Sequence, residues 1–268
     1  MNVIIIGISS DIGIALANDF IIKKYNIIGT YLNSSQKIEI LKKSGVKLFK
    51  CDVSHEKNIT KVLTRIKKFK WDVLIFSTGT QEPIDEFKKI KIFKVWEKSI
   101  YINFMSNLFF LHGLLSSVRK NKKKLPTVIF FAGGGTNNAT SCYSAYTISK
   151  IASIKVCELL DYEIKDIKFT ILGPGWVKTK IHNATIKNKK KSGNNYFKTL
   201  DMINSNKFYP IEKVVECCNW LIKAKKQLVG GRNFSAAHDP WEKKIINKII
   251  KNDNNFKLRR FGNNFFEK

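Results

Sequence analysis

The stretch Val3-Ile4-Ile5-Ile6-Gly7-Ile8-Ser9-Ser10-Asp11-Ile12-Gly13 near the start of the chain decides the fold. Its four leading apolar residues predict a short buried strand, and residues 14–22 have the spacing of an amphipathic helix. Gly7 and Gly13 flank a Ser-Ser pair and allow the backbone to turn sharply between the two elements. A turn of this kind directs amide donors and a helix N-terminus at one point, which predicts a cradle for pyrophosphate.

The same alternation of strand and helix continues along the chain. Helix-period segments separate most of the short apolar runs. These runs lie at residues 3–6, 27–31, 46–51, 73–76, 128–131, 169–172 and near 233–236. The pattern predicts an α/β protein with a doubly wound, Rossmann-type three-layer fold, in which helices cover both faces of a mostly parallel seven-stranded sheet. Loops at the carboxyl ends of such strands form the ligand site, and Gly79, Gly133 and Gly173 fall there.

The domain organisation follows from length and local composition. At 268 residues and 44% apolar content, the chain suits a single domain, which we place at residues 1–240. Residues 185–207 are rich in Lys and Asn and are expected to form a mobile substrate loop, with a plain surface insertion as the alternative. Residues 241–268 are expected to be a helix and a basic tail. The tail segment Leu258-Arg259-Arg260-Phe261 could pack on its own chain, on a partner subunit or on a membrane surface.

The charge of the chain is strongly positive, with 48 Lys and Arg against 21 Asp and Glu and a formal net charge of +27. A positive charge of this size is typical of proteins that bind nucleic acid. The basic residues are nearly all lysines, however, and they are spread over the whole length, as at residues 67–68, 189–191 and 225–226. This distribution is typical of a solvated surface, so no specific nucleic-acid partner is expected. An anionic substrate or a phosphorylated cofactor is compatible with the charge.

The cysteines and the hydropathy pattern predict the compartment. The five cysteines form neither a CxxC pair nor an even disulfide framework, which predicts reduced thiols in the cytoplasm. No stretch reaches the roughly 18 uninterrupted apolar residues of a membrane span, so no transmembrane segment is expected.

A second informative segment is Tyr146-Thr147-Ile148-Ser149-Lys150. Residues four apart share one face of a helix, so the phenol and the ammonium are expected to lie side by side. A nearby ammonium favours phenolate and is expected to bring the phenol pKa from about 10 nearer to neutrality. Such a phenol exchanges a proton with a substrate oxygen. Together with the pyrophosphate cradle, the pair predicts nicotinamide-dependent chemistry on a carbonyl or an alcohol.

With these two segments in order, the chain resembles the short-chain dehydrogenase/reductase family. The family's TGxxxGxG motif corresponds to residues 6–13, with Asp11 in place of the middle glycine. The Asp11 carboxylate is expected to cap the following helix, or to repel pyrophosphate if it points inward. The family's YxxxK motif corresponds to residues 146–150 and its PGxxxT segment to residues 174–179, while Ser77-Thr78-Gly79 stands in place of Asn-Ala-Gly. The resemblance covers about residues 3–180.

The resemblance implies a set of cofactor contacts. The glycine motif and the PGxxxT segment hold the phosphates and the nicotinamide, and the pair after the third strand contacts the adenine ring. The implied cofactor-binding residues are Gly7, Ser9, Ser10, Ile12, Gly13, Asn33, Asp52, Val53, Gly79, Tyr146, Lys150, Pro174, Gly175, Val177 and Thr179. No metal-binding residue is implied. The end of the second strand, around Asn33, has no carboxylate to bind ribose hydroxyls and has Lys37 nearby, which favours NADP over NAD.

The resemblance also assigns the reacting residues and the assembly. It implies Tyr146 as general acid/base, Lys150 as its electrostatic partner and a ligand of the nicotinamide ribose, and Asn103 as the holder of a relay water. A packing or capping amide is the alternative for Asn103. The implied substrate is a small-molecule carbonyl or alcohol. As in relatives, the helices around residues 103–115 and 145–160 are expected to pack between subunits of a homodimer or homotetramer.

One expected residue is missing, because the family's catalytic serine position is Gly133 in this chain. A lost donor to the substrate oxygen is worth roughly 1 to 3 kcal/mol in a low-dielectric site. Three hypotheses follow. Thr136, Ser141 or backbone amides of the Gly133-Gly134-Gly135 loop replace the donor; the enzyme works slowly or on a substrate with an activated carbonyl; or the chain binds the cofactor as a sensor or scaffold without turnover.

Overall fold

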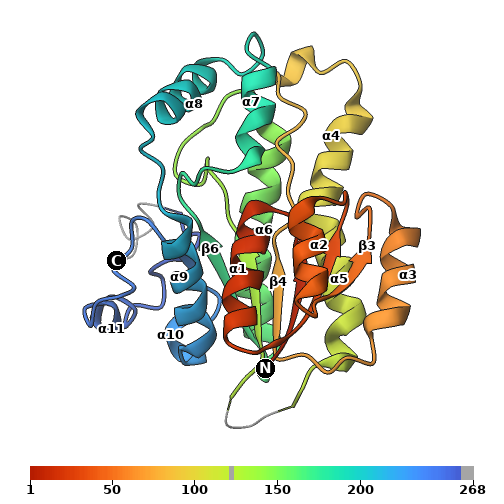
Figure 1. The fold of residues 1–268 in the computed structure, drawn as a ribbon. Coiled ribbons are helices and arrows are strands. Elements are labelled where there is room, and N and C mark those ends of the chain that lie inside the picture. Colours follow the sequence, from red (N-terminus) through yellow and green to blue (C-terminus); the bar gives the residue numbers. More distant parts are fainter. Residues whose placement is uncertain (121–123, 261–268) are drawn as a thin grey trace.

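The computed structural model of the chain describes residues 1–120 and 124–260. Its centre is one sheet in which every neighbouring pair of strands is parallel. The strands are β1 (Asn2–Ile6), β2 (Asn26–Tyr31), β3 (Lys47–Lys50), β4 (Val73–Phe76), β5 (Thr127–Phe131), β6 (Lys168–Gly173) and β7 (Asn233–Ser235). Their order across the sheet is β3-β2-β1-β4-β5-β6-β7. The predicted seven-stranded Rossmann-type sheet is therefore confirmed, and it is parallel throughout (Figure 1).

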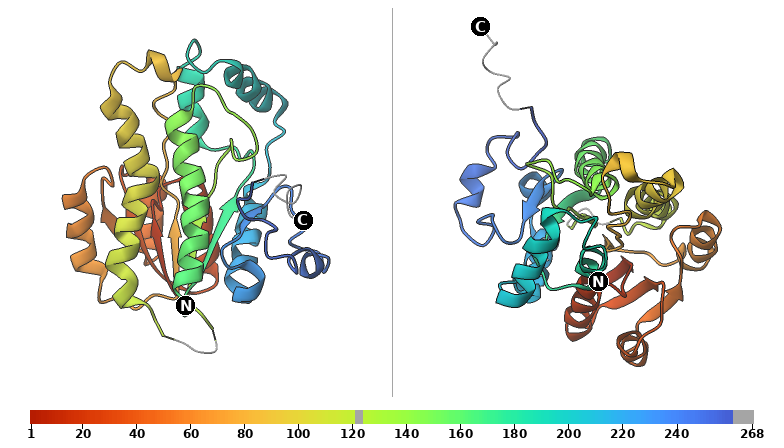
Figure 2. Two further views of the ribbon diagram at one scale, coloured as in Figure 1. Left: turned by 180° about the vertical axis from the view of Figure 1, so that it is seen from behind. Right: turned by 90° about the horizontal axis from the view of Figure 1, so that it is seen from above.

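Helices cover both faces of this sheet, as the two opposite views in Figures 1 and 2 show. One face carries α1 (Asp11–Ile22), α2 (Gln36–Lys43) and α9 (Ile211–Lys223). The other carries α3 (Glu56–Ile66), α5 (Ser106–Leu114) and α6 (Ser144–Glu163). The remaining helical segments are α4 (Phe93–Ile100), α7 (Asn183–Lys187), α8 (Asn194–Ser205), α10 (Lys226–Val229), α11 (Ile246–Ile249), a π-helical turn η2 (Tyr101–Met105) and the short 3-10 turns η1 (Phe87–Lys89), η3 (Leu115–Ser117) and η4 (Lys180–His182).

Two apolar cores, one on each face, explain the continuous apolar runs of the strands. Successive side chains of a strand point to opposite faces, so a strand buried on both sides has few polar positions. In β1, Val3 and Ile5 join the core under α1 and α9, whereas Ile4 and Ile6 join the core under α3, α5 and α6. Because the central strands β1, β4 and β5 are buried on both faces, the loops at their carboxyl ends have a firmly packed base.

The segment expected to be a loop is largely helical. Within residues 185–207, α7 ends and α8 forms, and both lie above the carboxyl ends of the strands (Figure 1). Polar side chains anchor α7, because buried Ser192 donates a hydrogen bond to the Thr185 carbonyl at 3.0 Å. The composition suggested a loop, but these buried hydroxyls satisfy backbone groups and allow compact helices. A substrate-dependent movement of the segment stays a prediction.

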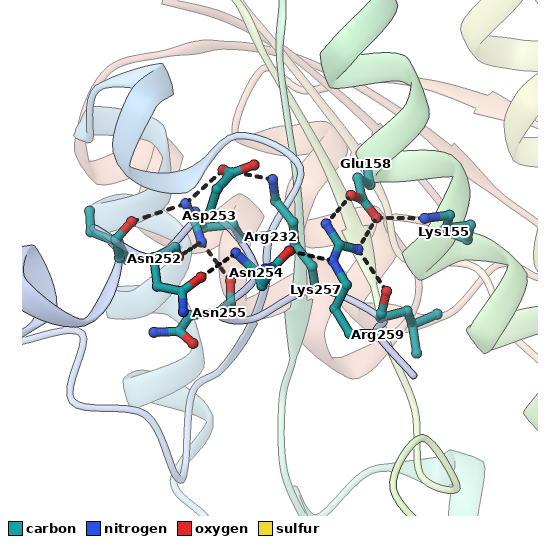
Figure 3. A network of polar contacts seen from close by, with 11 residues as sticks. Lys155, Glu158, Arg232, Asn252, Asp253, Asn254, Asn255, Lys257 and Arg259 are labelled. Carbon is teal, nitrogen blue, oxygen red and sulfur yellow. Dashed lines mark hydrogen bonds and ion pairs between the residues drawn. The ribbon is translucent and has the colours of Figure 1, made fainter. Parts of the chain in front are cut away.

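The C-terminal part of the chain binds to the body of the same chain. Among its described residues, up to 260, the helix is α11 (Ile246–Ile249), shorter than the helix expected from about Trp241. Residues 250–259, which we call the C-terminal strap, are held by buried Arg232, whose guanidinium donates to carbonyls of the strap (Figure 3). Arg259 also pairs with Glu158 on α6 at 2.7 Å. The predicted tail residue Phe261 lies outside the described residues.

The Glu158–Arg259 pair predicts an acid-sensitive part of the stability. The hydrogen bond from Arg259, opposed by burial and aided by Lys155, lowers the pKa of Glu158 from 4.5 to about 2. This contribution is complete above about pH 4.5 and is lost as the pH falls toward 2. Glu158→Gln should therefore lower the free energy of unfolding by about 1 kcal/mol near neutral pH, since water screens part of the pair. Denaturant titrations should find that this difference shrinks below about pH 4.

The control for this prediction is Glu163→Gln, an exposed carboxylate on the same helix. It should leave the unfolding free energy nearly unchanged over the same pH range. A Glu158→Gln effect that stays constant from neutral pH to about pH 3 would contradict the assigned role of the pair.

Candidate active site

The turn after β1 has the geometry of the predicted phosphate cradle. Gly7 has a φ of 83°, in the left-handed region, and a Cβ there would lie 2.7 Å from Thr78 Cγ2. A Cβ on Gly13 would lie 2.8 Å from the carbonyl oxygens of Gly7 and Ile8. Both distances are too short for a side chain, so this close packing of the turn requires glycine at both positions. The Ser10 hydroxyl accepts from the Gly13 amide at 2.9 Å and caps α1.

Asp11 has a different role from the predicted cap. Ser10 supplies the cap, so that expectation is wrong. The Asp11 carboxylate instead accepts a hydrogen bond from the backbone N–H of Lys180 at 2.8 Å. The ammonium of Lys180 donates back to the Ser9 carbonyl, also at 2.8 Å. The loop after β6 is thereby joined to the loop after β1.

A cavity of about 1190 Å³ lies at the carboxyl ends of the central strands. It brings together predicted residues from the loops after β1, β4 and β6, from the first turn of α1 and from α6. Those that line it are Ser10, Ile12, Gly79, Tyr146, Lys150, Pro174, Gly175, Val177 and Thr179. Asn33, Asp52 and Val53 are not among its lining residues and lie near the carboxyl ends of β2 and β3. Asp52 there binds the amide and hydroxyl of Ser54 at 2.9 and 2.7 Å, and these bonds outweigh the effect of burial and lower its pKa.

Asn103 is fully buried in the π-helical turn and binds the loop after β4 through both ends of its amide. Its Oδ1 accepts from the Thr80 N–H at 2.8 Å, and its Nδ2 donates to the Thr80 carbonyl at 2.9 Å. A Cβ on Gly79 would lie 3.7 Å from Asn103 Oδ1 and 3.9 Å from Lys150 Nζ. Asn103 therefore positions the loop beside Lys150, which is the packing role left open from the sequence. A relay water at this residue stays a prediction.

Tyr146 and Lys150 project from successive turns of α6. The buried ammonium of Lys150 donates to the Phe131 carbonyl at 3.0 Å and lies 5.7 Å from the centroid of the Tyr146 ring. Burial lowers the pKa of Lys150 to about 8 and raises the pKa of Tyr146 to about 12. The expectation of a phenol pKa near neutrality is therefore wrong for this structure. Desolvation of the phenolate outweighs the ammonium, whose N–H is directed at a backbone carbonyl.

The Tyr146 side chain leaves no space for a Cβ at residue 133, so glycine fits there. A Cβ at residue 133 would overlap the phenol oxygen and would lie 2.7 Å from Tyr146 Cζ and 2.9 Å from Lys150 Cγ. The phenol thus occupies the space in which a serine side chain would begin. The three glycines of the loop and Thr136 line the cavity, and the Thr136 hydroxyl donates to the Gly133 carbonyl at 3.4 Å. Ser141, the other candidate donor, is not a lining residue of the cavity.

Two hydroxyl groups and a side-chain amide form a hydrogen-bonded chain in the cavity lining that was not predicted from the sequence. Buried Tyr143 lies 2.7 Å from the Thr185 hydroxyl, which donates to Gln81 Oε1 at 3.1 Å. Each of these residues lines the cavity, and the chain joins α7 to the loop after β4. The Thr147 hydroxyl is buried and finds no hydrogen-bond partner among the described residues. The position of Tyr143, one helical turn before Tyr146, was the available signal.

Comparison with known proteins agrees with this geometry. The family model for short chain dehydrogenases matches residues 1–190, so the chain belongs to the short-chain dehydrogenase family. No curated protein matches the chain in sequence. Among solved structures, a short-chain dehydrogenase/reductase from Saccharomyces cerevisiae is 20% identical, with 89% of this chain and 96% of that chain covered and a TM-score of 0.76.

Two further similar structures were solved with nicotinamide dinucleotides. A 4-hydroxyisoleucine dehydrogenase complexed with NADH is 22% identical, covers 87% of this chain and 96% of its own, and has a TM-score of 0.72. An actinorhodin polyketide ketoreductase with NADPH is 15% identical and has a TM-score of 0.73, with 87% of this chain and 94% of that chain covered. At these identities the likeness establishes the fold alone. In addition, no helix within residues 1–120 and 124–260 is long and apolar enough to cross a membrane.

Proposed function

We propose that the chain is an NAD(P)-dependent oxidoreductase that interconverts a carbonyl and an alcohol of a small molecule. The observation that carries the proposal is the pairing of Tyr146 with Lys150 beside a glycine-lined cavity at the carboxyl ends of the strands. The turn at Gly7 and Gly13 fits a dinucleotide, because its backbone leaves no space for side chains and ends at a helix N-terminus. A bound nicotinamide would supply or accept the hydride.

The residues of this chain handle the proton. Tyr146, protonated at neutral pH because its pKa is about 12, donates the phenolic proton to the substrate oxygen during reduction. Lys150, with a pKa near 8, is positively charged below that pH and stabilises the phenolate that forms. Asn103 holds the loop that carries Gly79 against Lys150 and is the proposed site of the relay water. Amides of the glycine loop, or Thr136, are the proposed second donors to the substrate oxygen.

The experiment that tests this function follows nicotinamide absorbance during turnover with a broad panel of aldehydes, ketones and alcohols. Dinucleotide-dependent turnover that requires the Tyr146 hydroxyl supports it. The glycine at residue 133 favours one alternative, a sensor or scaffold protein that binds the cofactor without turnover. Saturable dinucleotide binding without Tyr146-dependent turnover of any panel member would favour that alternative.

We further propose that NADP is preferred to NAD. The exposed residue Asn33 follows β2, where a carboxylate would repel a 2'-phosphate, and Lys37 lies in the first turn of α2. Asn33→Asp is expected to change the ratio of the NADPH and NADH dissociation constants by about tenfold in favour of NADH. Fluorescence titrations with both dinucleotides measure this ratio. Asn26→Asp, at the opposite end of β2, is the matched control and should leave the ratio unchanged; an unchanged ratio in Asn33→Asp would contradict the preference.

A homodimer or homotetramer is the proposed assembly. The faces of α6 and α4 opposite the core carry exposed apolar side chains, including Ile148 and Leu159 on α6 and Val95 on α4. These two residues of α6 are eleven positions apart and share one helix face. Light scattering after size exclusion should give at least twice the 30.8 kDa of one chain, and Ile148→Asp should give one chain mass. A native chain that elutes with the mass of a monomer would contradict this assembly.

The proposed location is the cytoplasm. All five cysteines are free thiols, and four of them are buried. Free buried thiols are typical of proteins that fold in a reducing compartment.

A further inference from the structure

Two hydrogen bonds join loops on opposite sides of the predicted cofactor cleft. The Lys180 N–H donates to Asp11 Oδ2, and the Lys180 ammonium donates to the Ser9 carbonyl, each at 2.8 Å. Ser9 belongs to the glycine-rich turn after β1, Asp11 begins α1 directly after that turn, and Lys180 follows the PGxxxT segment after β6. The partners are separated by 169 and 171 residues in the sequence. Lys180 therefore binds the opposite loop through both its backbone N–H and its side-chain ammonium.

The position of this contact in the sheet explains its consequence. Strands β4 and β5 lie between β1 and β6, so the two loops must reach across the crevice to meet. Asp11, Thr179 and Lys180 line the same cavity as Tyr146. A dinucleotide held by the glycine turn on one side and by residues 174–179 on the other must lie between these loops. The contact therefore spans the route by which such a ligand enters or leaves.

The charges at the contact are balanced. A carboxylate in a phosphate-binding turn repels an anionic ligand unless cations and N–H donors face it. The Asp11 carboxylate faces the Lys180 N–H on one oxygen and Lys37 at 3.9 Å on the other. The loop contact thus directs the carboxylate toward Lys180 and adds the Lys180 ammonium at the turn. The Asp11 carboxylate thus joins the two loops through a hydrogen bond that a glycine, which has no side chain, could not accept.

We propose that Asp11 and Lys180 form a clasp that closes over bound nicotinamide dinucleotide and sets its rate of exchange. This proposal rests on the proposed cofactor-binding function. It adds two residues that set how fast the dinucleotide dissociates. The clasp opens for entry and release, so its two hydrogen bonds add to the barrier for dissociation. Both residues act by holding loops, and neither is placed at the reacting atoms.

The test measures the dissociation rate of NADPH by stopped-flow fluorescence, with excess NADP as the displacing ligand. Asp11→Ala removes the acceptor and should accelerate release by about tenfold, and Lys180→Met, which keeps the backbone donor, by several-fold. Asp11→Asn keeps a carbonyl oxygen as acceptor while it removes the charge, so its rate should stay close to that of the native chain. Lys43→Met, at an exposed lysine on α2 that does not line the cavity, is the control for lost positive charge and should leave the rate unchanged.

The outcomes separate the clasp from the function on which it rests. Rates that rise in Asp11→Ala and Lys180→Met but not in Asp11→Asn or Lys43→Met support the clasp. Saturable NADPH binding with an unchanged rate in Asp11→Ala would overturn the clasp and leave the proposed function standing. Equal acceleration in Lys43→Met and Lys180→Met would assign the effect to charge alone and would also overturn the clasp. A native chain that binds no dinucleotide would overturn both.

Discussion

Tyr146→Phe is expected to lower the turnover number for any accepted carbonyl by about a hundredfold to ten-thousandfold, because a positioned general acid contributes roughly 10² to 10⁴ in rate. The variant keeps the ring that fills the space beside Gly133 and removes only the hydroxyl. The dissociation constant for the dinucleotide should therefore remain within about twofold of the native value. Steady-state kinetics and fluorescence titration on the same preparation check the two expectations together.

The control is Tyr143→Phe. Tyr143 lines the same cavity one helical turn away, and its hydroxyl binds Thr185 at 2.7 Å. This variant should retain most of the turnover, with a moderate rise in KM, since it loosens α7 without removing the acid. Equal loss of turnover in the two variants would contradict the assignment of Tyr146 as the proton donor.

Gly133→Ser, which introduces the residue that the family usually has, is expected to lower activity rather than raise it. The added Cβ would overlap the Tyr146 hydroxyl and crowd Lys150 Cγ at 2.9 Å. Both reacting side chains would have to move, and a shift of about 1 Å at an active site can cost roughly a hundredfold in rate. Displacement of packed side chains should also cost about 1 to 3 kcal/mol of stability. Turnover numbers and thermal unfolding measure the two effects.

Gly134→Ser is the matched control, because a Cβ on Gly134 has no atom within 4 Å among the described residues. It adds the same hydroxyl to the same loop and should leave stability and turnover close to native values. A Gly133→Ser variant with higher turnover than the native chain would contradict the account. It would mean that the phenol moves readily and that the missing serine limits the rate.

The sequence predicted those parts of the molecule that depend on local pattern. Apolar runs such as residues 3–6 predict strands because a strand buried on both faces has few polar positions. The turn could be predicted from Gly7 and Gly13 because its close packing leaves no space for a side chain at either position. The pairing of Tyr146 with Lys150 could be predicted because residues four apart share a helix face. Each of these signals lies within a short stretch of chain.

The parts that could not be predicted depend on contacts between distant segments. Asp11 looked like a helix cap, and its partner Lys180 lies 169 residues away. The pKa of Tyr146 was expected to fall, but its direction depends on how the enclosed phenol is desolvated, which no local pattern records. The polar segment around Thr185 looked like a loop, because the burial of its hydroxyls depends on the tertiary fold.

The most direct test of the account is a calorimetric titration of the native chain with NADPH, followed by the same titration with NADH. The account predicts saturable binding at one site per chain, tighter for NADPH, since the glycine turn and the loop after β6 form a single cleft. Absence of saturable heat with either dinucleotide, up to millimolar concentrations, would contradict the claim that this cleft holds a nicotinamide cofactor beside Tyr146.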